Sequence, residues 1–115
     1  MDRRIELVLE KLEAQETCGW ANWELAESVN LSASRFRHLF KSELGKTPTQ
    51  FIKELRLKRS EKLLKETFLS IKEISAAVGF SSPSYFVREF KKSFRLSPSL
   101  YRKRFGPGST QPKNT

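Results

Sequence analysis

The octet "SRFRHLFK" at residues 34–41 returns fifty residues later as "SYFVREFK" at 84–91, and both copies fit the pattern S-x-F-x-x-x-F-K. Two Phe residues four positions apart lie on the same face of an α-helix, so each octet predicts a helix with a buried aromatic stripe. A shorter apolar pattern precedes each octet, at 25–31 and at 74–80, and the second copy has one extra residue in its turn. A short helix, a tight turn and a longer helix form a helix-turn-helix unit, so this sequence predicts two small helical units.

The apolar spacing is helical along the whole sequence, and no stretch alternates like a β-strand for more than a few residues. We therefore expect an all-α fold. A long helix over 48–66 is expected to join a first subdomain at 1–47 to a second one at 67–105. Residues 106–115 begin with Gly-Pro-Gly and continue as a polar tail, which we expect to be disordered.

Residues that cap helices stand in front of most of these segments. Two stretches, "TPTQ" at 47–50 and "SIKE" at 70–73, match the capping box, in which two side chains satisfy the first backbone N–H groups of a helix. Asn30 is expected to take the left-handed backbone conformation in the first turn, where the second turn has Gly79. The predicted helix-start residues are Asn22, Ser32, Thr47, Ser70, Ser82 and Ser97, and Trp20 and Trp23 are expected to clamp the first helix onto the second.

The charge of the chain limits the kind of partner. There are 22 Lys and Arg against 13 Asp and Glu, which gives a net charge of +9. Residues 1–21 carry a net charge of −2, residues 22–66 carry +4 and residues 67–115 carry +7. A small basic domain usually binds a polyanion, and the uneven distribution indicates that one face of the molecule meets it. The single cysteine and the lack of a long apolar run or leader pattern predict a cytosolic protein.

Each repeated helix is expected to bury its Phe residues and to expose a basic face. The expected outward residues are Ser34, Arg37, His38 and Lys41 in the first copy, and Ser84, Val87, Arg88 and Lys91 in the second. Arg and Ser side chains can hydrogen-bond to base edges in the major groove, which admits one helix, whereas Lys neutralises phosphates. The expected phosphate contacts are Lys41 and Lys91, with Ser32, Ser81 and Ser82 at helix N-termini. The alternative for each face is a solvated surface, which its repetition makes less favourable.

The remaining reactive residues do not form an enzyme site. His38 is the only histidine and has no Cys or acidic cluster at metal-ligand spacing, so a base contact or a surface position is favoured over a metal site. Cys18 has no visible base beside it and is expected to be partly buried and inert. The sequence contains no paired carboxylates, phosphate-binding glycine loop or Ser/His/Asp set. We therefore predict no enzymatic activity, no cofactor and no metal.

Two longer stretches resemble one known family. "GFSSPSYFVREFKKSFRLSPSLYR" at 79–102 is similar to the signature of the AraC/XylS transcriptional regulators, and "LAESVNLSASRFRHLFKSELGKTPTQFIKELRLKRSEKLL" at 25–64 resembles the first half of their DNA-binding domain. The resemblance implies seven helices in two homeodomain-like helix-turn-helix subdomains, with recognition helices at 32–44 and 83–94 in successive major grooves. It implies base contacts from Ser34, Arg37, His38, Pro83, Ser84, Tyr85 and Arg88.

This sequence departs from the family pattern at four positions. Asn30 and Arg95 stand where glycine is common, so we expect Asn30 to substitute for it and the helix end at Arg95 to be less regular. Ser60 replaces a usual Ala in the long helix, and His38 stands where Arg is frequent. The first subdomain is therefore expected to read its bases more weakly or differently.

The function implied by the resemblance is sequence-specific binding of double-stranded DNA by a bacterial transcription regulator, an activator that contacts RNA polymerase in the nucleoid. Two alternatives stay open: a non-specific architectural nucleic-acid binder, and a basic protein-interaction domain that meets an acidic partner. Because both reading helices lie in one chain, we expect a monomer on an asymmetric site, with dimerisation possible through a domain outside this chain. The chain is either a stand-alone short regulator or the DNA-binding part of a longer one.

Overall fold

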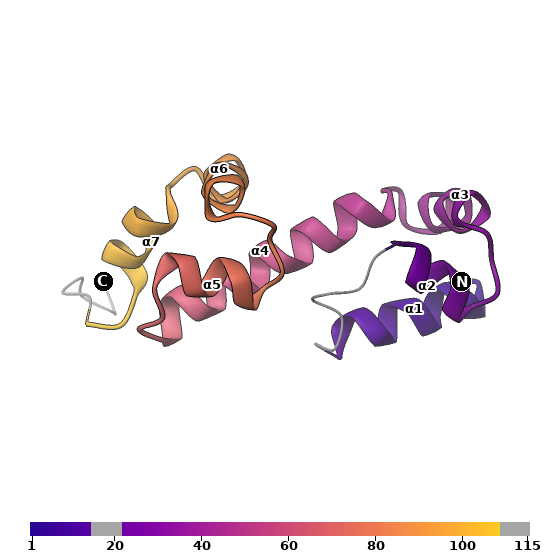
Figure 1. The fold of residues 1–115 in the computed structure, drawn as a ribbon, viewed down its shortest axis with the longest axis horizontal. Coiled ribbons are helices and arrows are strands. Elements are labelled where there is room, and N and C mark those ends of the chain that lie inside the picture. Colours follow the sequence, from indigo (N-terminus) through magenta and orange to yellow (C-terminus); the bar gives the residue numbers. More distant parts are fainter. Residues whose placement is uncertain (15–21, 109–115) are drawn as a thin grey trace. The chain divides into compact units, whose positions relative to one another are not determined.

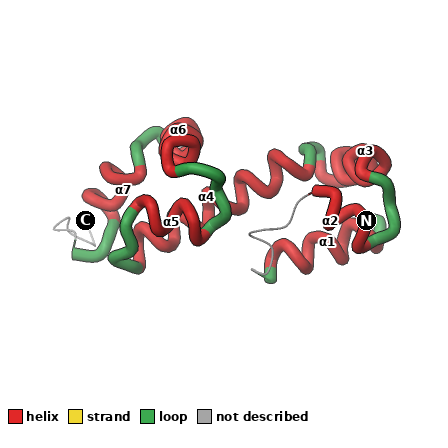
Figure 2. Tube along the Cα trace, in the orientation of Figure 1, coloured by secondary structure: helices red, strands yellow, loops and turns green. Residues whose placement is uncertain are grey.

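The computed structural model describes residues 1–14 and 22–108, and within them the regular structure is helical (Figure 1, Figure 2). The all-α prediction is confirmed. The described helices are α1 (Arg3–Glu13), α2 (Asn22–Ser28), α3 (Ala33–Leu44), α4 (Pro48–Glu66), α5 (Ile71–Ala77), α6 (Pro83–Phe94) and α7 (Pro98–Phe105). Their contacts divide the chain into a unit at 1–54 and a unit at 55–115, with the boundary inside α4. The finer predicted division, with 48–66 as a separate linker, stays a prediction.

The predicted capping residues begin most of the helices. The side chains of Ser32, Ser70, Ser82 and Ser97 each accept a hydrogen bond from the backbone N–H three residues later, at the start of α3, α5, α6 and α7. At the start of α4 the box is complete: the Gln50 N–H donates to Thr47 Oγ1 over 3.2 Å, and the Thr47 N–H donates to Gln50 Oε1 over 3.0 Å. These bonds satisfy donors that the helix itself leaves unpaired, so they fix where each helix begins.

Two predictions at α2 are wrong. Asn22 is the first residue of α2 and not its cap, and its side-chain amide donates to Thr49 Oγ1 over 2.8 Å, which ties α2 to the first turn of α4. Trp23 does not clamp the helices together, since 60% of its surface is exposed. The predictions for Cys18, for Trp20 and for the end of the tail lie outside the described residues.

The first unit packs α1, α2, α3 and the start of α4 around an apolar centre. The Phe36 and Phe40 rings of α3 are buried and lie edge to face with centroids 5.7 Å apart, and Phe40 meets Phe51 of α4 at 5.5 Å. The buried apolar residues of this unit are Ile5, Val8, Leu12, Leu25, Ala26, Val29, Phe36, Phe40 and Ile52. The aromatic stripe predicted from the first octet is therefore the centre of this core, and it holds α3 with its other face outward.

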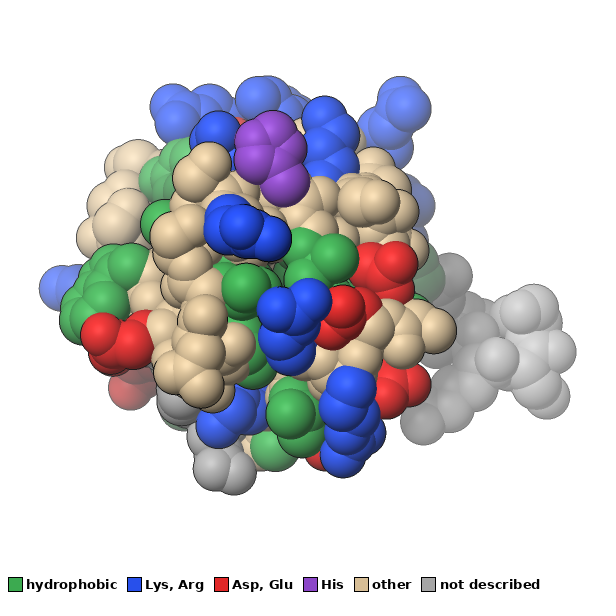
Figure 3. Space-filling model, turned by 90° about the vertical axis from the view of Figure 1, so that its right-hand side faces the viewer, with side chains coloured by type: hydrophobic (Ala, Val, Ile, Leu, Met, Phe, Trp, Pro, Cys, Tyr) green, Lys and Arg blue, Asp and Glu red, His purple; other side chains and the backbone are tan. Residues whose placement is uncertain are grey.

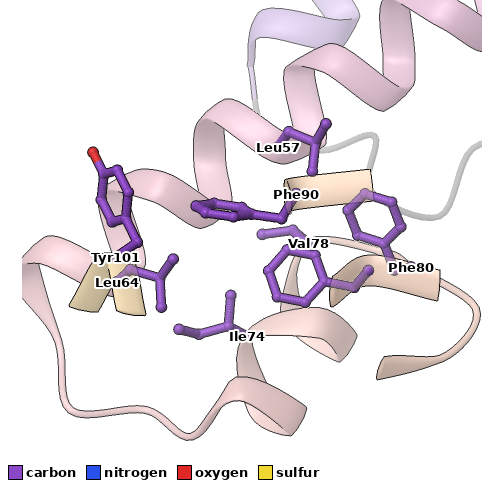
Figure 4. Close-up of a cluster of buried hydrophobic side chains, with 8 residues drawn as sticks. Leu57, Leu64, Ile74, Val78, Phe80, Phe90 and Tyr101 are labelled. Atoms are coloured by element: carbon purple, nitrogen blue, oxygen red, sulfur yellow. The ribbon is translucent and has the colours of Figure 1, made fainter. Parts of the chain in front are cut away.

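The second unit repeats the arrangement with more aromatic surface (Figure 4). Phe86 and Phe90 of α6 are buried with centroids 5.8 Å apart, and Phe90 meets the Tyr101 ring of α7 edge-on at 5.4 Å. The buried cluster comprises Leu57, Leu64, Ile74, Val78, Phe80, Phe86, Phe90 and Tyr101. Leu57 and Ser60 are the buried residues at the centre of α4, and Ser60 is fully buried. Ser60 fits because its hydroxyl donates to the Leu57 carbonyl over 2.6 Å.

One arginine from α7 caps the C-terminal end of α4. Arg102 donates to the carbonyl oxygens of Leu64, Thr67 and Leu69, at 3.4 Å for Leu64 and 3.2 Å for Thr67. The last carbonyls of a helix lack partners within it, so a guanidinium with several donors satisfies this end of α4 and fixes the loop to α5. Phe68, between these carbonyls in the chain, is 82% exposed.

The tight turns follow the repeat closely. Asn30 has φ 61° in the turn of the first unit, and Gly79 has φ 94° in the equivalent turn of the second. At the ends of the longer helices the order is reversed: Gly45 has φ 80° and Arg95 has φ 66°. Asn30 thus substitutes for glycine as predicted. The expectation of an irregular helix end at Arg95 is wrong. Arg95 adopts the left-handed conformation itself, and its N–H donates to the Lys91 carbonyl, as the Gly45 N–H donates to the Lys41 carbonyl in the first unit.

Candidate nucleic-acid interface

The outward face of α3 carries the residues predicted for the first copy. Ser34, Arg37, His38 and Lys41 are all exposed, and they lie opposite the buried Phe36 and Phe40. Arg37, His38 and Lys41 form no ion pair with another described residue, so their polar groups are available to a partner. Figure 3, which looks onto this unit, shows the histidine side chain at the surface with Lys and Arg side chains beside it. This basic face is the one that the first octet predicts.

The outward face of α6 carries the equivalent residues in the second unit. Pro83, Ser84, Arg88 and Lys91 are exposed, with Ser81 exposed just before the helix. Pro83 occupies the first turn of α6, where its missing N–H costs nothing and its ring stands at the helix tip. Tyr85 is half-buried: its ring lies edge-on against Phe80 with centroids 5.7 Å apart. The two faces therefore match in position and in basic character.

Arg88 is held in place on this face by its neighbours. Its guanidinium carbon lies 5.4 Å from the centre of the Tyr85 ring, and its Nε lies 3.7 Å from a carboxylate oxygen of Glu89. The Glu89 side chain is 8% exposed, and the same oxygen lies 3.5 Å from Lys92 Nζ. A guanidinium over an aromatic face gains electrostatic attraction and loses rotational freedom. Arg88 is thus an exposed cation that is supported by the Tyr85 ring and by Glu89. Such restriction suits a side chain that contacts one base pair of a DNA site.

One residue of this face differs from the expectation. Val87 was expected to point outward, but it is half-buried and packs against the apolar cluster of the second unit. Glu89, between Arg88 and Lys91 in the octet, is buried and pairs with Arg88 and Lys92. Val87 and Glu89 lie on opposite flanks of α6, each between the Phe stripe and the outward face.

The serines proposed as phosphate contacts differ in what their hydroxyls already do. Ser32 and Ser82 accept hydrogen bonds from the N–H groups of Arg35 and Tyr85, each over 3.2 Å. Each hydroxyl keeps its own proton to donate, so a phosphate oxygen is still a possible partner. Ser81 is exposed and precedes the helix by two residues.

Some residues near these faces escape sequence reasoning. Arg35 and the first-helix residue Arg4 line a surface hollow beside His38, although they lie thirty-one positions apart in the sequence. Only the contact of α1 with α3 brings them together, and no spacing rule connects them. Lys92 is exposed beside Arg88 and follows the Lys91 that the octet identified. Among the described residues no group of three His, Cys, Asp or Glu side chains is arranged for a metal, and no helix is both long and apolar enough to cross a membrane.

Comparison with known proteins decides the family. A profile described as a helix-turn-helix domain matches residues 25–104. The crystal structure of a transcriptional regulator from Chromobacterium violaceum, described as having an AraC-type DNA-binding domain, superposes with a TM-score of 0.81 at 30% identity, and the match covers 96% of both chains. This chain belongs to the AraC/XylS family of transcriptional regulators. The predicted family, and with it the prediction that the chain is not an enzyme, is confirmed.

Other similar proteins include longer transcriptional regulators and a solved DNA-binding domain. The HTH-type transcriptional regulator CdhR of Pseudomonas aeruginosa is 36% identical over 101 residues, which are 88% of this chain and 30% of CdhR. The lactose operon transcription activator of Staphylococcus xylosus is 35% identical over 88 residues, which are 76% of this chain and 32% of the activator. The DNA-binding domain of AdpA, solved in complex with a target DNA, has a TM-score of 0.77 at 28% identity, covering 90% of this chain and 95% of AdpA's. The chain spans about a third of the length of the curated relatives it matches.

Proposed function

We propose that this AraC-family chain binds double-stranded DNA in a sequence-specific way and regulates transcription. Its α3 and α6 enter successive major grooves of one site. The observation that carries the proposal is the repetition of one surface: in both units a helix anchored by two buried Phe rings exposes a basic face beside a tight turn. If each face were only a solvated surface, the basic residues, the turn and the helix cap would not be expected to recur together. The similar DNA-binding domain of AdpA, which was solved with a target DNA, supports the same partner.

The proposed contacts follow from chemistry and exposure. Arg37 and Arg88 present planar donors that fit the O6 and N7 acceptors of guanine, and Arg88 is supported by the Tyr85 ring. Lys41 and Lys91 neutralise phosphates and add affinity without sequence information. The proposed base contacts are Ser34, Arg37, His38, Pro83, Ser84, Tyr85 and Arg88, and the proposed phosphate contacts are Ser32, Lys41, Ser81, Ser82 and Lys91.

The regulator is proposed to act as an activator that touches RNA polymerase on the bacterial nucleoid. The support is its similarity to the lactose operon transcription activator of Staphylococcus xylosus. We expect one chain to occupy one asymmetric site, because both reading helices are in the same chain. Transcription in vitro from a promoter that carries the selected site tests this part: stimulation by the chain supports activation, and inhibition identifies a repressor.

The test of DNA reading is selection of binding sites from random duplexes, followed by fluorescence anisotropy with the selected sequence. We expect two short conserved boxes about one helical turn apart. Arg88→Ala should cost about 1–3 kcal/mol of binding and relax one box, and Arg37→Ala should relax the other box by a similar amount. Lys91→Ala should weaken all sequences alike. If no motif emerges and affinity only falls with salt, the chain is an architectural binder; absence of salt-dependent DNA binding favours a protein-interaction domain.

A further inference from the structure

A basic hollow lies beside the recognition helix of the first unit, and of the residues around it only His38 is among the proposed base contacts. It is about 320 Å³ in volume, open to solvent, and lined by Arg4, Leu31, Arg35, His38 and Leu39. Arg4 comes from α1, Leu31 from the turn before α3, and the others from α3. Two guanidiniums and an imidazole surround it, and the two leucines supply the apolar part. Such a lining fits an anion attached to a small apolar group.

Arg4 is ordered by the start of α1. Asp2 caps this helix by accepting from the Arg4 N–H over 2.8 Å, and the same carboxylate accepts from Arg4 Nε over 3.1 Å and from Arg4 Nη2 over 3.0 Å. The hydrogen bond from the guanidinium lowers the pKa of the Asp2 carboxyl, so the pair stays ionised at neutral pH. The Asp2 N–H in turn donates to Glu43 Oε1 of α3 over 2.7 Å. These bonds fix the guanidinium while leaving its Nη1 donors unused among the described contacts.

Arg35 faces the hollow without such a pair. Its backbone N–H is used by Ser32, its side chain is exposed, and it forms no ion pair with another described residue. On the helix it lies between the outward His38 and the half-buried Leu39, on one flank of the recognition face. The major groove is about 12 Å wide, so a helix inside it has a sugar-phosphate backbone along each of its flanks. The hollow therefore opens where one of these backbones would pass.

We propose that this hollow binds one backbone phosphate of the DNA, held by Arg4 and Arg35, with the adjoining deoxyribose against Leu31 and Leu39. The inference rests on the proposed function and adds a contact from α1, a helix outside the helix-turn-helix motif. Arg4 and Arg35 give charge-assisted hydrogen bonds to phosphate, and Asp2 orients Arg4. The contact sets the position of α3 in the groove and carries no sequence information.

The test uses the selected duplex and a matched pair of variants. Arg3 and Arg4 are neighbours on α1, but Arg3 turns away and pairs with Glu6 and Glu10 at 3.3 and 3.5 Å. We expect Arg4→Gln and Arg35→Gln each to weaken binding several-fold, and each to reduce the slope of log affinity against log salt by about 0.9. Arg3→Gln should change that slope much less. Equal effects of Arg3→Gln and Arg4→Gln would overturn the inference.

A second arm locates the phosphate. Single methylphosphonate substitutions along the duplex remove one phosphate charge at a time. One position near the box read by α3 should weaken binding to the wild-type chain and have no further effect on Arg4→Gln. If every phosphate that matters to the wild-type chain matters equally to Arg4→Gln and to Arg35→Gln, the hollow does not hold one. Arg35→Gln leaves the Asp2–Arg4 pair intact, so it keeps the test valid if Arg4→Gln unfolds α1.

A third arm separates DNA phosphate from a free anion. Pyrophosphate is titrated into the DNA-free chain while the arginine Nε–H signals are followed by NMR. We expect no saturation in the millimolar range, because the hollow is open and holds only part of a strand's contacts. Saturation at submillimolar pyrophosphate would assign the hollow to a small anion and overturn the DNA contact. A wild-type chain that binds no DNA at all refutes the proposed function itself, which these outcomes distinguish from failure of the hollow alone.

Discussion

The guanidinium of Arg88 lies over the ring of Tyr85, 5.4 Å from its centre, three positions along α6. Tyr85 in turn leans on Phe80 from the preceding turn, so the buried core of the second unit supports the proposed reader through one aromatic ring. Arg88 is therefore an exposed side chain that still has a protein contact to restrict it. The Tyr85 ring thus contacts Phe80 on one side and the Arg88 guanidinium on another.

Tyr85→Leu tests this support. The variant keeps apolar volume against Phe80 but removes the ring beneath Arg88, so binding of the selected site should fall about two- to fivefold, as expected for an exposed cation–π contact of about 0.5–1 kcal/mol. Anisotropy measures it. Tyr85→Phe keeps the ring and should bind nearly as the wild type, unless the hydroxyl itself contacts DNA. In an Arg88→Ala background the loss from Tyr85→Leu should shrink to the part that comes from the proposed base contact of Tyr85 itself; a loss of the same size there would show that the ring does not act through Arg88.

Arg95→Gly should stabilise the protein. Arg95 holds a left-handed conformation at φ 66°, which costs an L-residue roughly 1 kcal/mol, and glycine adopts it freely at some cost in unfolded-state entropy. We expect a gain of about 0.5–1 kcal/mol, measured as a higher thermal midpoint by circular dichroism. Asn30→Gly should gain less, since Asn tolerates this conformation. Arg95→Ala retains the strain and is the control; a gain from alanine as large as that from glycine would contradict the backbone explanation.

Ser75→Ala should also raise stability. Ser75 is 1% exposed in α5, and its hydroxyl oxygen finds no hydrogen-bond partner among the described residues. Burying an unpaired hydroxyl costs about 1–3 kcal/mol, so its removal should stabilise by about 1 kcal/mol in chemical denaturation. The control is Ser60→Ala in α4, whose buried hydroxyl is bonded to the Leu57 carbonyl and should therefore give a smaller gain or a loss. Destabilisation by Ser75→Ala would mean that the hydroxyl is paired in solution.

Tyr101 is expected to make stability fall in strong alkali. The phenol is buried and hydrogen-bonded to the Glu61 carboxylate; burial first, and the nearby carboxylate second, raise the pKa of Tyr101 above its ordinary value. The folded state therefore holds this proton more tightly than the unfolded state does. Its contribution is fully present below about pH 10, the pKa of an unfolded tyrosine, and is lost as pH rises above it.

Thermal unfolding of the wild type and Tyr101→Phe, measured from pH 8 upward, checks this. Tyr101→Phe lacks the titrating group, so its midpoint should decline less steeply above about pH 10. At neutral pH the variant should be less stable by about 1–3 kcal/mol, because the Glu61 carboxylate loses its donor. Parallel declines in the two proteins would show that Tyr101 does not titrate differently on folding.

Much of the fold is predictable because it depends on local chemistry. The capping residues Ser32, Thr47, Ser70, Ser82 and Ser97 each act on the backbone N–H three positions later, so the sequence alone places the starts of five helices. The Phe stripes are equally local, since the helix period defines their face.

The wrong predictions concern residues whose burial depends on other helices of the fold. Trp23 was expected inside because it is large and aromatic, but the core of the first unit is already filled from α1 and α3. Val87 lies on a flank of α6, where burial depends on how closely the neighbouring elements approach. The hollow at Arg4 and Arg35 could not be predicted at all, because it joins residues from separate helices without any periodic signal.

The exchanged turn residues have a consequence for the chain as a repeat. Asn30 corresponds to Gly79, Gly45 corresponds to Arg95, and Ala26 corresponds to Ser75, and each pair occupies the same place in a unit. In each pair, two different residues occupy equivalent positions of the two units, so one molecule shows that the position accepts both. Residues that are identical in the two units indicate what the unit requires. Where the units differ, the residue of one unit can be tested by substitution at the equivalent position of the other.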